Sequence, residues 1–205
     1  MALYKNFKFG SYGMVGVWKI TESLQELESS IALSEEEMAL YRQFRFDARK
    51  REWLAVRCLL HQMLGYYAPV HYLPSGKPWI DGCHISISHT KGYVGVSLSE
   101  KPTAIDLEYP SSRVEPLVHR FVSEEEMTMV DLQNKALSFL LIWSAKEALF
   151  KLYDQPGIIF NQDLYVRGLS LASQGSMIGG INKDGFVAET ELFFQVTDDL
   201  ILVYC

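Results

Sequence analysis

The sequence contains an internal repeat with a spacing of about 90 residues. Its clearest part is Leu-Ser-Glu-Glu-Glu-Met at 33–38, which returns as Val-Ser-Glu-Glu-Glu-Met at 122–127. A strand-like run precedes each copy, at 16–20 and at 104–108. A helical segment with a tryptophan, Trp53 or Trp143, follows each copy. A hairpin pattern comes next, at 85–98 and at 193–204. Four features repeated in one order predict two similar α+β halves that arose by duplication. We expect an N-terminal half over 1–102 and a C-terminal half over 103–205.

The local patterns predict the elements of each half. Ser34 is an expected helix N-cap, with Glu37 three residues later as in a capping box. Alternation, turn residues and helical periodicity predict the following elements: a strand at 14–20, helices at 35–44 and 48–66, a turn at 74–78 and a hairpin at 85–98. The second half repeats this order. Its larger spacing before the last hairpin predicts an additional loop or strand there.

Composition narrows the class of protein. The chain has 205 residues, of which 48% are hydrophobic, and this is enough for a substantial core. A formal net charge of -6 argues against binding to the phosphate backbone of a nucleic acid. Its three cysteines show no metal or redox spacing, and no apolar run reaches the roughly 20 residues of a membrane span. With no signal-peptide pattern at its start, we expect a cytoplasmic protein in a reducing compartment.

The segment 140–151 is predicted to be a helix that is apolar on nearly every side. Charged groups on such a helix are costly unless they are paired, bind a metal or belong to a site. At about 100° per residue, Ser144, Glu147 and Lys151 share one narrow sector, whereas Lys146 falls among apolar residues. An i, i+4 pair of Glu147 and Lys151 on an ordinary surface helix would also explain the pattern, and for this segment alone that reading is favoured.

The strand-like run 104–108 places Asp106 and Glu108 on the same side. Two neighbouring carboxylates repel each other unless they are solvated or bridged by a cation, and a third carboxylate would complete a site for Mg²⁺ or Mn²⁺. The alternative is an exposed strand face, which the run by itself favours. However, the equivalent positions of the first half hold Trp18 and Ile20, and this asymmetry is expected of one active site on a duplicated scaffold.

Two further groups could bind an anion. The strand 85–88 runs into a polar turn in which Ser88, His89 and Thr90 offer donors to a phosphate, with Lys77 as a nearby cation. A basic cluster also stands out in this acidic chain: Arg42, Arg45, Arg49, Lys50 and Arg51. A surface turn and a solvated helix face are the alternatives for these two groups. The functional interpretation is the capture of an anionic ligand or an acidic partner protein.

Together these segments resemble the 4′-phosphopantetheinyl transferases in their longer, two-halved form. Three blocks in the family's order carry the resemblance: Gly-Lys-Pro at 76–78 with Ile-Ser-His-Thr at 87–90, Ile-Asp-Leu-Glu at 105–108, and Trp-Ser-Ala-Lys-Glu-Ala-Leu-Phe-Lys at 143–151. The resemblance implies two pseudo-twofold-related α+β halves with the active site in the cleft between them. It also implies transfer of 4′-phosphopantetheine from coenzyme A to a serine of an apo carrier protein, with release of 3′,5′-ADP.

The resemblance implies roles for individual residues. Asp106, Glu108 and Glu147 would be the Mg²⁺ ligands, and Glu147 would also be the base for the carrier serine, directly or through a water molecule. Lys151 and Lys146 would face phosphate oxygens. The remaining residues implied to contact coenzyme A are Lys77, Ser88, His89 and, through its 3′-phosphate, Arg51. Glu126 is similar to a further acidic residue of the family.

The chain departs from the family at two points. Ala104 stands where the family usually has glycine, and the segment 33–38 is acidic where some relatives carry lysines. The expected partners are coenzyme A and an apo acyl carrier protein or a carrier domain of a polyketide or peptide synthetase. We expect a monomer without nucleic-acid or membrane binding. The alternatives are another Mg²⁺-dependent phosphodiesterase and a non-catalytic relative that binds coenzyme A or a carrier protein.

Overall fold

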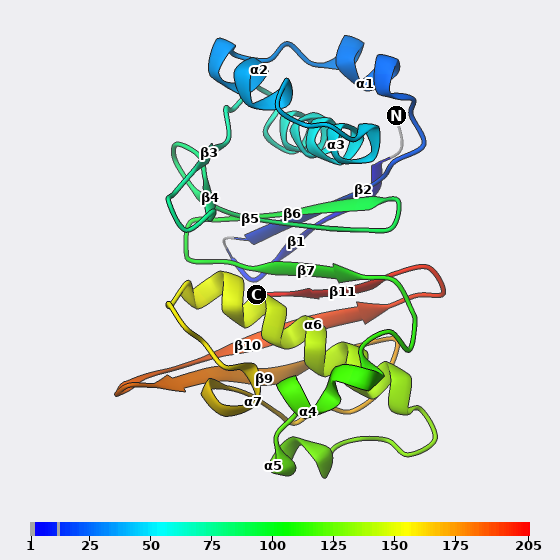
Figure 1. The fold of residues 1–205 in the computed structure, drawn as a ribbon, viewed down its shortest axis with the longest axis vertical. Coiled ribbons are helices and arrows are strands. Elements are labelled where there is room, and N and C mark those ends of the chain that lie inside the picture. The colour runs from blue at the N-terminus through cyan, green and yellow to red at the C-terminus, as the bar shows by residue number, and fades with distance from the viewer. Residues whose placement is uncertain (1–2, 12) are drawn as a thin grey trace. The chain divides into compact units, whose positions relative to one another are not determined.

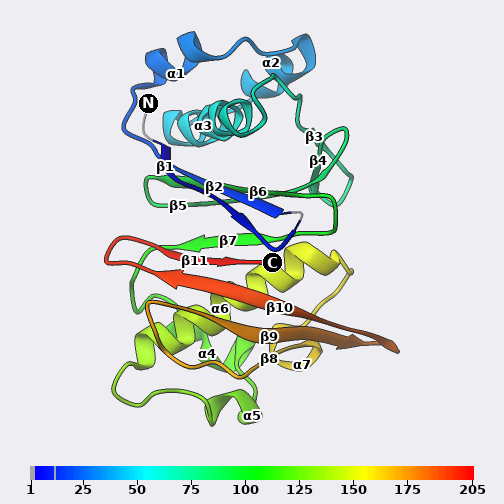
Figure 2. The same cartoon turned by 180° about the vertical axis from the view of Figure 1, so that it is seen from behind.

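The computed structural model describes residues 3–11 and 13–205, and the chain divides into two compact units at Thr103 and Ala104 (Figures 1 and 2). Each unit combines an antiparallel sheet with one long helix and several short ones. The predicted α+β class is therefore confirmed. The cleft expected between the halves stays a prediction.

Unit 1 is built on a four-stranded antiparallel sheet with the order β1-β2-β6-β5. Its elements in chain order are β1 (Leu3–Phe9), β2 (Gly13–Lys19), α1 (Leu24–Ser30), α2 (Glu35–Tyr41), α3 (Asp47–Leu64), β3 (His71–Tyr72), β4 (Pro78–Trp79), β5 (His84–Thr90) and β6 (Tyr93–Ser99). Helix α3 packs on β2 and β6 and buries one continuous stretch from Trp53 to Leu60. It ends at Gly65, whose φ of 78° is left-handed and favours a residue without a side chain.

Unit 2 is built on a five-stranded antiparallel sheet with the order β7-β11-β10-β9-β8. Its elements are β7 (Ile105–Glu108), the 3₁₀ turn η1 (Glu115–Leu117), α4 (Val118–Phe121), α5 (Glu124–Met127), α6 (Lys135–Tyr153), α7 (Phe160–Asp163), β8 (Leu164–Arg167), β9 (Gln174–Lys183), β10 (Phe186–Val196) and β11 (Ile201–Tyr204). The extra strands β8 and β9 confirm the additional structure that the larger spacing predicts.

Helix α6 forms because the segment has strong apolar character and neither glycine nor proline. It packs on β7, β8, β9 and β11, and its buried residues include Leu140, Leu141, Ala145 and Leu149. The helix ends at Asp154, which is left-handed with a φ of 49°. This packing turns one sector of α6 toward β7, and Ser144 and Lys151 of that sector bond to residues of β7.

The repeated glutamates have the same structural role in both units. In unit 1, Ser34 caps α2 by accepting from the Glu37 amide, and the Glu37 carboxylate accepts from Arg57 and from the Val70 amide. The Ser34 amide donates instead to the Tyr67 hydroxyl, which in turn donates to the Glu37 carboxylate, so the expected capping box is incomplete.

In unit 2, Ser123 and Glu126 form a complete capping box. The Glu126 carboxylate also pairs with Lys146 and accepts from the Val166 amide. Glu37 and Arg57 each precede their counterparts Glu126 and Lys146 by 89 residues. The repeat in the sequence therefore corresponds to a buried ion pair that recurs in the same place of each unit.

Four elements of unit 1 were not expected from the sequence: β1, α1 and the two-residue strands β3 and β4. Strand β1 has no counterpart in the repeat, and α1 is a short helix whose Ser23 and Glu26 form a capping box. The helix expected at 35–44 ends earlier, at Tyr41. Among the residues that the structure describes, no helix has both the length and the apolar character needed to cross a membrane.

Candidate active site

Asp106 and Glu108 lie on the face of β7 that meets α6, as their alternation predicts. Both are buried, with about 4% of each residue exposed. The exposed strand face considered as an alternative is therefore wrong. Buried carboxylates require partners, and α6 supplies most of them.

Asp106 is held at both carboxylate oxygens. Its Oδ1 accepts from Lys151 Nζ at 2.7 Å, and its Oδ2 accepts from Ser144 Oγ at 2.8 Å. Lys151 Nζ also donates to the Ile105 carbonyl at 3.0 Å, so it is tied to β7 at two points. Ser144 and Lys151, which the helical spacing put in one sector, thus meet the same carboxylate.

Glu108 is held by two donors on one oxygen. Its Oε1 accepts from Trp143 Nε1 at 2.9 Å and from the guanidinium of Arg113. Burial raises the pKa of Glu108, and the negative charge of Asp106 raises it further, against the lowering effect of Arg113 and Trp143. Trp143 therefore has a polar role in the site besides its packing.

Glu147 is the least satisfied of the three acids. Burial, then the charges of Asp106 and Glu108, raise its pKa to about 7, while Lys151 and Arg113 act in the opposite direction. No hydrogen bond to its carboxylate contributes to that shift among the described residues. A carboxylate in this setting is poised to exchange a proton near neutral pH or to bind a cation.

The three carboxylates have the chemistry of a divalent-cation site. They are hard oxygen donors whose charges repel one another, and a bound cation would relieve that repulsion. As the side chains stand, no group of three or more acidic, histidine or cysteine residues in the described part of the chain is arranged to hold a metal ion. Lys151 and Arg113 instead provide the positive charge beside Asp106 and Glu108.

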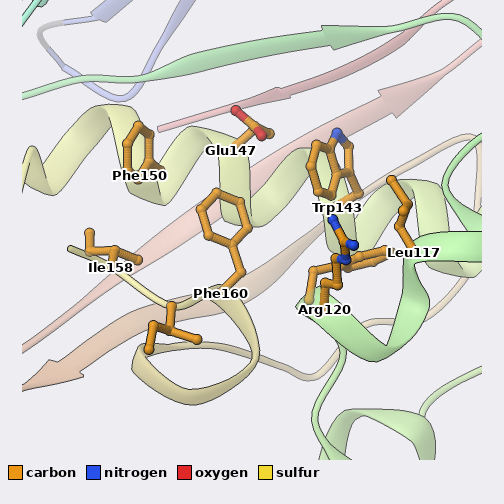
Figure 3. Close-up of a pocket in the computed structure, with 9 residues that line it drawn as sticks. Leu117, Arg120, Trp143, Glu147, Phe150, Ile158 and Phe160 are labelled. Carbon is orange, nitrogen blue, oxygen red and sulfur yellow. The ribbon is translucent and has the colours of Figure 1, made fainter.

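An apolar pocket of about 540 Å³ lies beside Glu147 in unit 2 (Figure 3). Figure 3 shows Glu147 between Trp143 and Phe150 along α6, with Phe160 facing them from α7. The other residues that line the pocket are Leu117, Arg120, Phe121, Ile158 and Ile159. A candidate base therefore borders a largely apolar recess with one arginine.

A second pocket, of about 190 Å³, lies in unit 1 between α3 and the end of β5. Arg49 and His89 meet there, with Arg49 Nη1 3.0 Å from His89 Nε2, and Glu52 contacts both. Gly76 and Pro78, the neighbours of Lys77, line the pocket as well. The structure thus brings His89 together with a basic residue of α3 and with the turn that carries Lys77.

Three of the expected contacts to coenzyme A do not line this pocket: Lys77, which lies between two residues that do, Ser88 and Arg51. Ser88 is buried and, by strand alternation, faces away from the side of His89. Arg51 is exposed and lies about 200° around α3 from Arg49, off the helix face that lines the pocket. The structure therefore places Arg49, rather than Arg51, beside His89.

Lys146 also differs from the expectation. Its ammonium is fully buried and donates to Glu126 Oε2 at 2.7 Å and to the carbonyls of Phe160 and Leu164 at 2.9 and 2.8 Å. The expectation that Lys146 faces a phosphate is thus corrected, because its position on the interior side of α6 directs it away from Glu147. Its buried position agrees with the helical spacing, which placed Lys146 among the apolar residues of the helix.

Comparison with known proteins connects this geometry to a family. A family model described as the 4′-phosphopantetheinyl transferase superfamily matches residues 102–187, which include the three acids and Lys151. The segment 102–187 is thus similar to this superfamily, over less than half of the chain. Among curated proteins it is similar to the 4′-phosphopantetheinyl transferase HetI of Nostoc sp. (strain PCC 7120), with 29% identity over an alignment of 161 residues that covers 67% of each protein.

The matched segment lies almost wholly in unit 2 and contains the acid cluster described above. Sequence reasoning missed Arg113, which lies five residues beyond Glu108 in a loop where no periodicity marks it. It also passed over Arg49, although the basic cluster contained it. A count of the positions that share one face with Trp53 on the predicted helix would have favoured Arg49 over Arg51.

Proposed function

We propose that this protein transfers the 4′-phosphopantetheine group of coenzyme A to a serine hydroxyl of an apo carrier protein, with Mg²⁺ and with release of 3′,5′-ADP. The observation that carries the proposal is the group of three buried or half-buried acids on β7 and α6, with Lys151 bonded to one of them. Similarity to the superfamily model and to HetI supports a transferase reaction with coenzyme A as the donor.

Glu147 is the proposed base for the acceptor hydroxyl. A pKa of about 7 lets the carboxylate be ionised in part of the molecules at neutral pH and still accept a proton readily. A carboxylate with an ordinary pKa of 4.5 would be a weaker base by more than two orders of magnitude in proton affinity. This pKa is that of the site without a cation, and a bound divalent cation would lower it by favouring the carboxylate.

Asp106, Glu108 and Glu147 are the residues that would hold Mg²⁺ or Mn²⁺. When bound, the cation would neutralise charge on the diphosphate of coenzyme A and on the leaving 3′,5′-ADP. Trp143 and Arg113 fix the orientation of Glu108, and Ser144 fixes that of Asp106. These bonds keep two of the three donors in place before any ligand binds.

Lys151 is the proposed phosphate contact of unit 2. Its side chain is about 26% exposed, so the ammonium can reach a ligand while it stays bonded to Asp106 and the Ile105 carbonyl. A pre-positioned cation stabilises a transferring phosphoryl group without reorganisation. Lys146 has no such access.

The pocket of unit 1 is proposed to bind the nucleotide end of coenzyme A. His89 and Arg49 provide donors for a phosphate there, and Lys77 stands next to two residues of its lining. Arg57 adds a further donor at the pocket, because its Nη2 is buried and has no hydrogen-bond partner among the described residues. Ser88 is retained as a contact on the other face of β5.

The proposed acceptors are acyl carrier proteins and the carrier domains of polyketide or peptide synthetases. We further propose a monomer that acts in the cytoplasm, where coenzyme A is available. The net charge of -6 supports a protein substrate over a polynucleotide.

The first experiment is mass spectrometry of an apo acyl carrier protein incubated with this protein, coenzyme A and Mg²⁺. We expect the mass of the carrier to increase by one phosphopantetheine, and EDTA to prevent the increase. Glu147→Gln is the matched variant, since it keeps the shape of the side chain and removes the base. The variant should leave the carrier unmodified while its circular dichroism spectrum matches that of the unaltered protein.

Two results would contradict the proposal. Binding of coenzyme A without modification of several unrelated carriers would favour a binding-only relative. Hydrolysis of a phosphodiester in the presence of Mg²⁺, without binding of coenzyme A, would favour a metal-dependent phosphodiesterase.

A further inference from the structure

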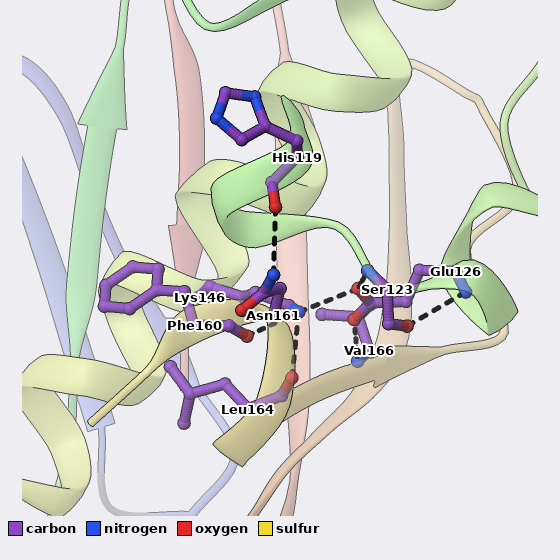
Figure 4. A network of polar contacts seen from close by, with 8 residues as sticks. All are labelled: His119, Ser123, Glu126, Lys146, Phe160, Asn161, Leu164 and Val166. Carbon is purple, nitrogen blue, oxygen red and sulfur yellow. Dashed lines mark hydrogen bonds and ion pairs between the residues drawn. The ribbon is translucent and has the colours of Figure 1, made fainter. Parts of the chain in front are cut away.

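Lys146 uses all of its hydrogen-bonding capacity inside unit 2. An ammonium group has three N–H donors. Figure 4 shows them directed at the Glu126 carboxylate and at the carbonyls of Phe160 and Leu164. The residue is 0% exposed, so the ion pair is shielded from solvent. Such a group is costly to bury unless every donor is satisfied, and here each one is.

The two carbonyls belong to the ends of α7. Phe160 is the first residue of this helix and Leu164 is the residue that follows it. A helix of four residues satisfies few of its own backbone groups and has little stability by itself. Lys146 therefore ties α7 to α6 through both ends. A second tether joins Asn161 Nδ2 to the His119 carbonyl at 2.9 Å.

This tether determines one wall of the pocket beside Glu147. The ring of Phe160 lies 5.7 Å from the ring of Trp143 and 5.6 Å from that of Phe150, measured between centroids. The preceding residues Ile158 and Ile159 continue the same wall. Because Lys146 fixes the Phe160 carbonyl, it also limits how far this wall can move from Glu147.

Unit 1 shows why the residue is a lysine here. Arg57, the counterpart of Lys146, donates to Glu37 and to the Trp53 carbonyl of its own helix. At this point of the repeat unit 1 has the short strands β3 and β4, whereas unit 2 has α7, β8 and β9. A compact ammonium with three rotatable donors can reach carbonyls of the added segment, while a planar guanidinium is suited to the paired carboxylate.

We propose that Lys146 is a positioning residue that holds the segment 158–164 against α6 and so keeps in place the wall of the pocket along which the carrier serine would approach Glu147. The inference rests on the proposed function, in which Glu147 accepts the proton of the acceptor serine. Lys146 does not touch a substrate in this role. It acts through Phe160 and the two isoleucines.

Three variants separate the tether from the ion pair and from general stability. Glu126→Gln removes the charge of the partner but leaves Lys146 bonded to both carbonyls. The double variant Lys146→Met with Glu126→Gln removes the tether and leaves no unpaired buried charge. Leu192→Ala, a fully buried core substitution outside the pocket lining, is the control for a loss of stability alone.

Hydrogen exchange of the full-length protein tests the tether without any substrate. In the double variant we expect the amides of 158–164 to exchange at least tenfold faster than in Glu126→Gln and in Leu192→Ala. Equal exchange in the double and single variants would overturn the inference.

Carrier modification at saturating coenzyme A tests the functional part. We expect the double variant to raise KM for the carrier at least tenfold, with kcat changed less than threefold, and the single variant and Leu192→Ala to keep KM within threefold. An unchanged KM in the double variant would refute a positioning role. If the unaltered protein transfers nothing, the proposed function fails, whereas faster exchange in the double variant would still establish that Lys146 holds α7.

Discussion

Replacement of Glu147 by glutamine should stabilise the protein at alkaline pH in the absence of a divalent cation. The carboxylate is partly buried and faces the charges of Asp106 and Glu108, and these effects together raise its pKa from 4.5 to about 7. A raised carboxylate pKa means that the folded state binds the proton more tightly than the unfolded state. Below the unfolded-state pKa both states are protonated and ionisation has no effect. As the pH rises from about 4.5 to 7, the unfolded state releases this proton while the folded state keeps it, so the folded state loses stability; above pH 7 the loss is complete.

The size of the effect follows from the shift. One pKa unit corresponds to about 1.4 kcal/mol, so the full shift would destabilise the folded state by about 3 kcal/mol above pH 8. Because Glu147 is partly accessible to solvent, we expect a gain of roughly 1–3 kcal/mol for Glu147→Gln. In a domain of about 100 residues this corresponds to a rise in Tm of at least 4 °C or so.

Thermal denaturation with EDTA at pH 5 and at pH 8 measures this effect. Glu147→Gln should raise Tm at pH 8 and have little effect at pH 5, whereas Glu191→Gln, at an exposed glutamate of β10, should have little effect at either. Mg²⁺ should then raise Tm of the unaltered protein more than that of Glu147→Gln. An equal effect of Glu147→Gln at both pH values would show that the carboxylate does not lie beside the other two acids.

Three more predictions concern activity and binding. Asp106→Asn should lower carrier modification at least a hundredfold, while Trp18→Phe, at the equivalent position of unit 1, should lower it only as far as stability falls; initial rates and Tm together decide this. Arg49→Ala should weaken binding of coenzyme A about tenfold by calorimetry, and an equal loss in Arg51→Ala would contradict the placement beside His89. Trp143→Phe removes the hydrogen bond to Glu108 and should cost about 1 kcal/mol of unfolding free energy in urea; no change would show that the bond is not formed in solution.

The sequence predicted most of the regular elements because their signals are local. The alternation at 104–108 and the apolar helix at 140–151 follow from periodicities of two and 3.6 residues, and both elements occur where expected. The same periodicities placed Asp106 and Glu108 on one side of a strand, and Ser144 and Lys151 on one side of a helix. In the structure these two faces meet, because Ser144 and Lys151 of the helix donate hydrogen bonds to Asp106 of the strand.

Which partner each charged side chain takes was decided by tertiary packing. Two adjacent residues of α6 show this, since Lys146 points into the interior of unit 2 and Glu147 toward the acids of β7. The helical spacing placed Lys146 among apolar residues and Glu147 in the sector of Lys151. The partners that bury Lys146 depend on α7, which begins 13 residues after Glu147 and carries no strong signal of its own. Arg113 became a partner of Glu108 for a similar reason, because a loop conformation brought it there. Local periodicity determines the side of an element on which a residue lies, whereas burial and pairing depend on segments that the chain adds elsewhere.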